Sequence, residues 1–156
     1  SVEVCAMRNE KRMNYRAYFG IKYHEDNRNR DEIDSITAVL KDDGMSTVCV
    51  GRDIEKWGNL TLSPQELMGI AFEKIDESDF VVLEMSKKGV GLGIEAGYTA
   101  AKNKPLVVLI KAGLELSNTM QGIADVVIEY RHPEEIKMPA HIKALQRTRT
   151  SRAAEL

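Results

Sequence analysis

Five short runs of apolar and β-branched residues recur along the chain, and segments with helical patterns separate them. The runs span residues 16–21, 46–50, 80–85, 106–110 and 125–130. Runs of this length and composition predict β-strands. The third and fourth runs each contain at least four consecutive apolar residues, which is typical of strands that are covered on both faces.

Amphipathic stripes predict helices between these strands. Residues 30–40 carry Ile33 and Ile36 on one stripe, and Gly44 follows as a stop signal. Ser63 and Glu66 have the spacing of a capping box, which predicts the start of a second helix there. Further helices are predicted over residues 93–102, around residues 118–122, and from Pro133 through Ile136, Ile142 and Leu145.

The regular alternation of strands and helices predicts a parallel sheet with right-handed crossovers. Five strands favour a flavodoxin-like α/β three-layer sandwich with the strand order 2-1-3-4-5. We expect one domain over residues 14–147, a disordered lead-in over residues 1–13 and a flexible tail over residues 148–156. The irregular polar stretch 51–62 is expected over the carboxyl ends of the strands, where such folds bind ligands.

Composition and charge narrow the classes of partner. The chain is 43% hydrophobic and 29% charged with a net charge of −2, so nothing favours a nucleic acid polymer or a membrane surface. Its two cysteines make no disulfide framework, which suits a cytoplasmic protein. The three histidines show no metal-ligand spacing, and we expect neither a metal nor a cofactor.

The segment with the clearest chemistry is Gly89-Val90-Gly91-Leu92-Gly93-Ile94-Glu95-Ala96-Gly97-Tyr98, which follows the third predicted strand. Glycines at 89, 91 and 93 remove side chains where backbone can approach a ligand. Glu95 is expected in the first turn of the next helix, where free N–H groups and the helix dipole favour its carboxylate form. Such a carboxylate can attack an anomeric carbon, although a glutamate there can also serve only the helix dipole. A dinucleotide fingerprint would place its glycines after the first strand instead.

Gly-Leu-Gly-Ile-Glu-Ala-Gly-Tyr resembles the nucleophile motif of the nucleoside 2-deoxyribosyltransferases and of the related 2′-deoxynucleoside 5′-phosphate N-hydrolases. Shorter pieces resemble the family in the same order, over roughly residues 16 to 130. They are Tyr18-Phe19-Gly20 with Asp26 and Asn29 after it, Ser78-Asp79-Phe80-Val81-Val82, and Asn118-Thr119-Met120. In the transferases, the Asn-x-Met stretch reaches the sugar site of a neighbouring subunit.

The resemblance implies a mechanism that parallels a retaining glycosidase. Glu95 would attack C1′ of a deoxyribosyl group, the base would leave, and a second base or water would take the sugar from the covalent ester. It also implies a homodimer or higher homo-oligomer, with Asn118 contributed across the interface. The substrate-binding residues that it implies are Tyr18, Phe19, Gly20, Asp26, Gly89, Gly91, Gly93, Asn118 and Met120. For Tyr18, Phe19 and Met120, a place in the core is an equally good interpretation.

The sequence departs from the family at the acid that protonates the leaving base. The family's aspartate position falls on Ala71 here, and its helical neighbours carry no carboxyl group. Asp53 and Glu84 are the candidate replacements. Each also has a purely structural interpretation, as a turn residue for Asp53 and as a charge that fixes nearby groups for Glu84.

The loop after the first strand indicates which group the substrate carries at its 5′ end. Glu25 and Asp26 would repel a phosphate there, although Lys22 could attract one, and Asn118 stands where the hydrolases tend to have a serine. These features favour a nucleoside with a free 5′-hydroxyl. The alternatives are a 2′-deoxynucleoside 5′-monophosphate N-hydrolase and a non-catalytic domain that binds a nucleoside or nucleotide.

Overall fold

Five parallel strands form one sheet in the order β2-β1-β3-β4-β5. The computed structural model describes residues 14–24, 26 and 29–142 of the chain. The strands are β1 (Tyr15–Ile21), β2 (Met45–Val48), β3 (Phe80–Glu84), β4 (Leu106–Lys111) and β5 (Val126–Tyr130). The predicted flavodoxin-like α/β sandwich is thereby confirmed.

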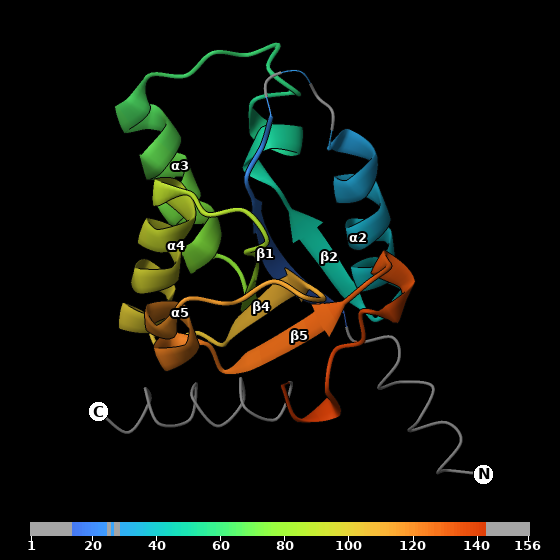
Figure 1. Ribbon diagram of the computed structural model, residues 1–156. Helices are drawn as coiled ribbons and strands as arrows, with labels where there is room; N and C mark the ends of the chain where they lie inside the picture. The colour runs from blue at the N-terminus through green and yellow to red at the C-terminus, as the bar shows by residue number, and fades with distance from the viewer. Residues whose placement is uncertain (1–13, 25, 27–28, 143–156) are drawn as a thin grey trace, which may run out of the picture.

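Helices cover both faces of this sheet (Figure 1). Helix α2 (Arg30–Asp42) lies on one face, whereas α3 (Pro64–Asp76), α4 (Val90–Ala101) and α5 (Asn118–Ile123) lie on the other. In the part of the chain that the structure describes, no helix combines the length and the apolarity that crossing a bilayer requires.

The central strand β1 supplies side chains to both cores. Ala17 and Phe19 are fully buried in the cluster that α2 covers, whereas Tyr18 is buried in the cluster that α3 and α4 cover. This alternation follows from the two-residue period of a strand. It places the phenol of Tyr18 on the same side of the sheet as the glycine-rich start of α4.

Local sequence signals set the start of α3. The Ser63 hydroxyl accepts a hydrogen bond from the Glu66 backbone N–H, and the Glu66 carboxylate accepts one from the Ser63 N–H, so the predicted capping box is confirmed. Pro64 occupies the first helical position, where its missing N–H costs nothing.

The predicted bounds of two elements are wrong. The second strand stops at Val48, and the chain turns at once into a π-helical segment, η1 (Val50–Ile54). The helix expected from Pro133 is a short 3-10 turn, η2 (Pro133–Glu135), followed by non-helical chain up to Pro139. A proline disfavours helical backbone in the residue before it, which accounts for the non-helical backbone at Met138 before Pro139. Residues 140–142 are helical, and the predicted lead-in, the tail and Leu145 lie outside the described residues.

Candidate active site

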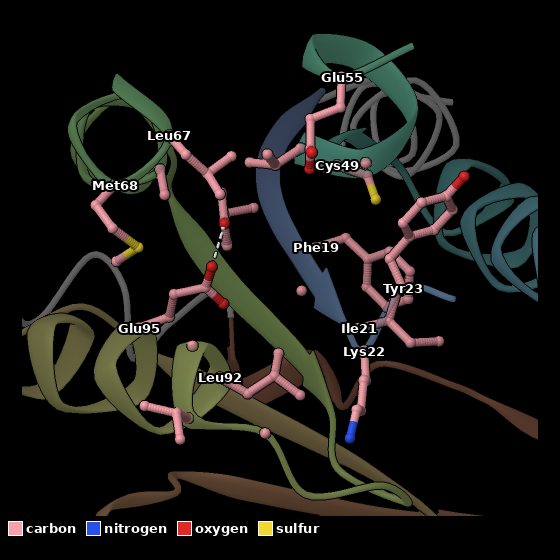
Figure 2. A pocket seen from close by; sticks show the side chains of 18 residues that line it. Phe19, Ile21, Lys22, Tyr23, Cys49, Glu55, Leu67, Met68, Leu92 and Glu95 are labelled. Atoms are coloured by element: carbon pink, nitrogen blue, oxygen red, sulfur yellow. Dashed lines mark hydrogen bonds between the residues drawn. The ribbon is translucent and has the colours of Figure 1, made fainter. Parts of the chain in front are cut away.

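A cavity of about 390 Å³ opens at the carboxyl end of β1, within the size range of about 300–1,000 Å³ that is usual for ligand pockets. Its walls come from β1, the η1 turn, α3 and the start of α4 (Figure 2). Most lining residues are apolar or glycine. The lining residues with polar side-chain groups are Tyr18, Lys22, Tyr23, Cys49, Glu55 and Glu95.

Glu95 and Tyr18 form the central contact of this cavity. The Tyr18 hydroxyl donates a hydrogen bond of 2.6 Å to Oε1 of Glu95, and it joins β1 to α4. Burial, and then the charge of Glu95, raise the pKa of Tyr18 far above its usual value. The phenol therefore keeps its proton and remains a donor at every physiological pH.

The environment of Glu95 differs from the one that the sequence predicts. Helix α4 begins at Val90 after its N-cap Gly89, three residues earlier than expected, so Glu95 lies in the second turn and not in the first. Burial raises the pKa of its carboxyl group, and the hydrogen bond from Tyr18 offsets only part of that rise. The expected stabilisation of the carboxylate by the helix start is wrong, and the phenol of Tyr18 favours that form instead.

Gly20 leaves room for the Glu95 carboxyl group, which lies against it. A Cβ at position 20 would lie 2.9 Å from Oε2 of Glu95 and 2.6 Å from Cδ2 of Leu83. Both distances are shorter than side-chain contacts allow. A glycine at the end of β1 therefore leaves the space that the carboxyl group fills.

The three glycines before Glu95 do not form a glycine-rich turn. None of Gly89, Gly91 and Gly93 has a positive φ, and the last two lie within α4. Gly89 and Gly91 line the cavity, whereas Gly93 does not. A Cβ at Gly91 would meet no atom within 4 Å, so this glycine leaves open space beside the cavity.

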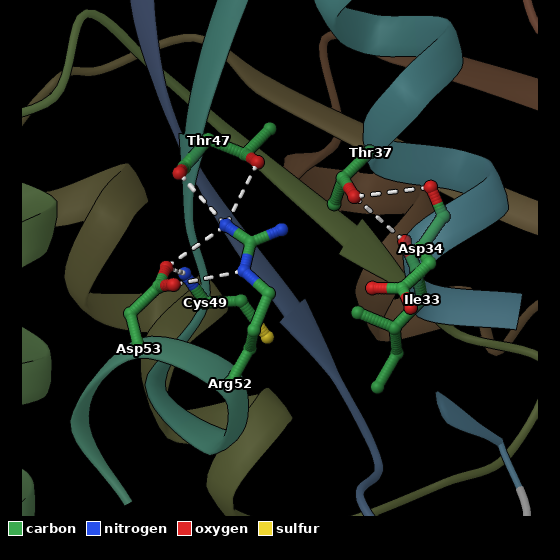
Figure 3. Close-up of polar contacts among 7 residues, drawn as sticks. All are labelled: Ile33, Asp34, Thr37, Thr47, Cys49, Arg52 and Asp53. Carbon is green, nitrogen blue, oxygen red and sulfur yellow. Dashed lines mark hydrogen bonds and ion pairs between the residues drawn. The ribbon is translucent and has the colours of Figure 1, made fainter. Parts of the chain in front are cut away.

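Asp53, one candidate acid, is held in an ion pair and does not line the cavity (Figure 3). Arg52 donates two hydrogen bonds to its carboxylate, at 2.9 and 2.8 Å, and the Cys49 backbone N–H donates a third at 2.9 Å. Burial alone would raise the pKa of Asp53, but these donors and the Arg52 charge outweigh it and lower the pKa. The structure thus gives Asp53 the properties of an anchor for η1, not those of a proton donor.

Glu84, the other candidate acid, borders a different cavity. It is 3% exposed at the end of β3, and it accepts hydrogen bonds from the Tyr130 hydroxyl at 3.0 Å and from the Ser86 backbone N–H. The cavity that it lines has a volume of about 300 Å³ and does not include Glu95. The structure does not bring Glu84 and Glu95 together.

The remaining predicted residues fall into two groups. Tyr18, Phe19 and Gly20 line the cavity with Glu95, although Phe19 is also fully buried in the α2 core. Asp26 and Asn118 are exposed and lie outside the cavity lining, and Met120 is buried in the core under α5. Within the described part of the chain, no cluster of three or more potential metal ligands occurs.

Glu55 lines the cavity and was missed by sequence reasoning. It follows η1 directly, and burial raises the pKa of its carboxyl group. Ala71, where the family resemblance would place an acid, lines the same cavity from α3 with a methyl group. The irregular polar stretch 51–62 was a sequence signal for this part of the site. The predicted strand was extended to residue 50, however, so the turn that brings Glu55 inward was not predicted.

Cys49 also lines the cavity, but its chemistry is limited by burial. It is 3% exposed, and burial raises the pKa of its thiol above the usual value. Since only the thiolate is a strong nucleophile, Cys49 acts here as a packing residue. Glu95 is thus the better placed nucleophile among the lining side chains.

Comparisons with known proteins support the fold. No family model and no curated protein matches the sequence. The CMP N-glycosidase BcmB of Clostridium botulinum matches in structure with a TM-score of 0.54 at 18% identity, over 85% of this chain and 97% of that one. The 2-deoxyribosyltransferase of Bacillus psychrosaccharolyticus matches with a TM-score of 0.63 at 14% identity, over 81% and 95%. BlsM matches with a TM-score of 0.59 at 21% identity, over 92% and 96%. At identities this low, these structural matches establish a shared fold and nothing further.

The raised pKa of Glu95 predicts a pH-dependent cost to stability. As pH rises above the usual pKa of a glutamate, the unfolded chain loses this proton first, so the folded state loses stability until pH passes the raised pKa. Glu95→Gln removes this titration. We expect the free energy of unfolding of the variant, relative to that of the unchanged protein, to increase from pH 4 to pH 7. Urea unfolding of both proteins across this range measures it, and a constant difference would contradict the buried position of the carboxyl group.

Proposed function

We propose that this protein cleaves the N-glycosidic bond of (deoxy)nucleosides through a covalent glutamyl–sugar intermediate on Glu95, and transfers the sugar to another base or to water. One observation carries the proposal: a carboxyl group in a largely apolar cavity, held by a phenol at 2.6 Å. The resemblance of the Gly-Leu-Gly-Ile-Glu-Ala-Gly-Tyr motif supports it. So does the fold shared with a CMP N-glycosidase and a 2-deoxyribosyltransferase.

The two oxygens of Glu95 have different surroundings. Oε1 accepts the hydrogen bond from Tyr18, whereas Oε2 receives none from the described residues and lies over Gly20. Tyr18 thus fixes the orientation of the carboxylate and leaves Oε2 as the attacking atom. Exclusion of water by the apolar walls leaves this oxygen less solvated, and the sugar bound in the cavity presents C1′ to it.

A nucleoside 5′-monophosphate is a second candidate substrate. Lys22 lines the cavity and reaches the start of α4, where its ammonium group donates to the Lys88 carbonyl oxygen at 3.3 Å. Gly89 caps α4 without a side chain, so the first N–H groups of that helix have no side-chain acceptor. A 5′-phosphate beside Lys22 would use both features.

The proposal includes a homo-oligomer whose interface uses α4 and α5. Val90 is 82% exposed, Ile94 47% and Ile123 38%, and glycines and alanines occupy the other exposed positions of α4. Association of two copies through this face would cover the apolar side chains and bring the Asn118 end of α5 towards the partner copy.

We expect light scattering during gel filtration to give at least twice the 17.5 kDa mass of the chain. Ile94→Lys should shift the protein towards the monomer, because it places a charge in the apolar interface. Leu60→Lys is the matched control, since Leu60 is 48% exposed but lies outside α4 and α5. A monomeric unchanged protein would refute the interface.

Replacing the nucleophile should abolish the reaction. We expect Glu95→Gln to lower kcat/KM by on the order of 10⁴-fold or more, since no covalent intermediate can form. Deoxynucleosides, ribonucleosides and their 5′-monophosphates are incubated with and without a free acceptor base, and the products are separated by chromatography. New nucleosides indicate transfer, and free base alone indicates hydrolysis. Glu73→Gln, on the exposed face of α3, is the control. Absence of any product from the unchanged protein would favour a binding domain.

The phenol of Tyr18 should set the lower pH limit of the reaction. Its hydrogen bond lowers the pKa of Glu95 against the effect of burial. Tyr18→Phe removes that bond, so the pKa of Glu95 rises and less of the nucleophile is ionised at a given pH. We expect the acidic limb of the kcat/KM profile to move to higher pH. An unmoved acidic limb would show that Tyr18 has no influence on the reacting carboxylate.

A further inference from the structure

Glu55 lies on the cavity wall opposite the catalytic helix, and nothing in the motif resemblance assigns it a role. We propose that Glu55 is the general acid that protonates the departing base and the general base of the second step. This proposal rests on the proposed function of Glu95. The first observation is that the two carboxyl groups line one cavity from different elements, Glu95 from α4 and Glu55 from the end of η1 (Figure 2).

The backbone of Glu55 is fixed by hydrogen bonds on both sides. Its N–H donates to the Val50 carbonyl oxygen at 2.9 Å, and its own carbonyl oxygen accepts from Gly58 and Leu60 at 3.0 and 2.9 Å. The η1 turn beneath it is tied to β2, because Arg52 donates to the Thr47 carbonyl oxygen at 2.9 Å. Within the turn, Arg52 also donates to Asp53. The side chain of Glu55 therefore starts from a defined position on the wall.

The side chain itself has no competing partner. Among the described residues, no hydrogen bond or ion pair engages the Glu55 carboxyl group, whereas Asp53 two positions earlier is held by a guanidinium group. Burial raises the pKa of the Glu55 carboxyl group. A carboxyl group with a raised pKa and no cation beside it keeps a larger share of its protonated form near neutral pH, as a proton donor requires.

Tyr18 separates the roles of the two carboxyl groups. Both have raised pKa values because of burial, but only Glu95 accepts a hydrogen bond from a phenol, and that bond favours its ionised form. Glu55 has no such donor among the described residues. We therefore assign the nucleophile to Glu95, which has a donor that favours its ionised form, and the proton to Glu55, which has none in the described part of the chain; a double-displacement reaction at an anomeric carbon needs this pair of roles.

In the first step, Oε2 of Glu95 forms a bond to C1′ while the bond between C1′ and the base nitrogen breaks. The electron pair of that bond passes to the base, and the Glu55 proton passes to a ring nitrogen of the base. In the second step, the Glu55 carboxylate takes a proton from water or from the incoming base as that nucleophile bonds to C1′. The ester bond to Glu95 breaks, and its electron pair returns to the carboxylate, so both residues regain their starting forms.

The test uses pairs of substrates that differ only in whether the base needs a proton to leave. One pair is 2′-deoxyguanosine and its N7-methylated cation, and the other is 2′-deoxyuridine and its 5-nitro derivative, whose base departs readily as an anion. The pair that the unchanged protein cleaves is used. Glu55→Gln keeps the size of the side chain but cannot give up a proton.

We expect Glu55→Gln to lower kcat/KM on the ordinary nucleoside by about 10²- to 10⁴-fold, the usual contribution of general acid catalysis. On the activated partner, kcat/KM should stay within about threefold of that of the unchanged protein, because it reports base departure, which there needs no general acid. The kcat on that substrate should fall, because the second step loses its general base. Glu95→Gln should lose activity on both substrates alike. Glu73→Gln, on the exposed face of α3, should keep its activity on both. Circular dichroism confirms that each variant is folded.

Each result decides between the two roles. If Glu55→Gln lowered kcat/KM equally on both members of a pair, its role as the acid would be overturned, and the function of Glu95 would stay intact. Unchanged rates on the ordinary nucleoside would overturn it as well. If the unchanged protein cleaves neither ordinary nor activated substrates, the proposed function fails and the role of Glu55 fails with it.

Discussion

The site depends on the burial of one carboxyl group against one phenol. Glu95 is partly buried in a cavity with mainly apolar walls, and Tyr18 on the central strand supplies the hydrogen bond that favours its ionised form. Burial makes this carboxylate costly to the folded state, since ionised groups lose hydration there. The sheet and α4 must hold the two groups in place at that cost, and Gly20 leaves the space that Oε2 of Glu95 fills.

Four carboxyl groups near this edge of the sheet differ chiefly in their hydrogen-bond partners. Arg52 forms an ion pair with Asp53. Glu84 accepts hydrogen bonds from the Tyr130 hydroxyl and from a backbone N–H. Those two groups serve the structure. Glu95 has a single phenol as its side-chain partner, and the Glu55 carboxyl group has none among the described residues. The residue type is common to three of the four, so the surroundings, not the amino acid, determine which groups are available for chemistry.

Much of the fold was predictable because strands and helices carry local signals. The strand order and the capping box at Ser63 follow from short runs of residues, and both are confirmed. The ends of elements depended instead on particular side-chain contacts, which a run of residues does not signal. The second strand stops early at Val48 and η1 begins at Val50, where Arg52 ties the turn to Thr47 of β2. Glu55 was hidden for the same reason, since only that turn brings it to the cavity.

A proton donor can change position in such a cavity more easily than a nucleophile can. Attack on C1′ requires an oxygen atom in line with the breaking bond, which restricts where a nucleophile can stand. Proton transfer requires only hydrogen-bond reach of some nitrogen on a flat base that extends across the cavity. Ala71 on α3 and Glu55 after η1 line the same cavity. If Glu55 is the acid, as we propose, the methyl group at Ala71 removes that function from one wall of the cavity without removing it from the site.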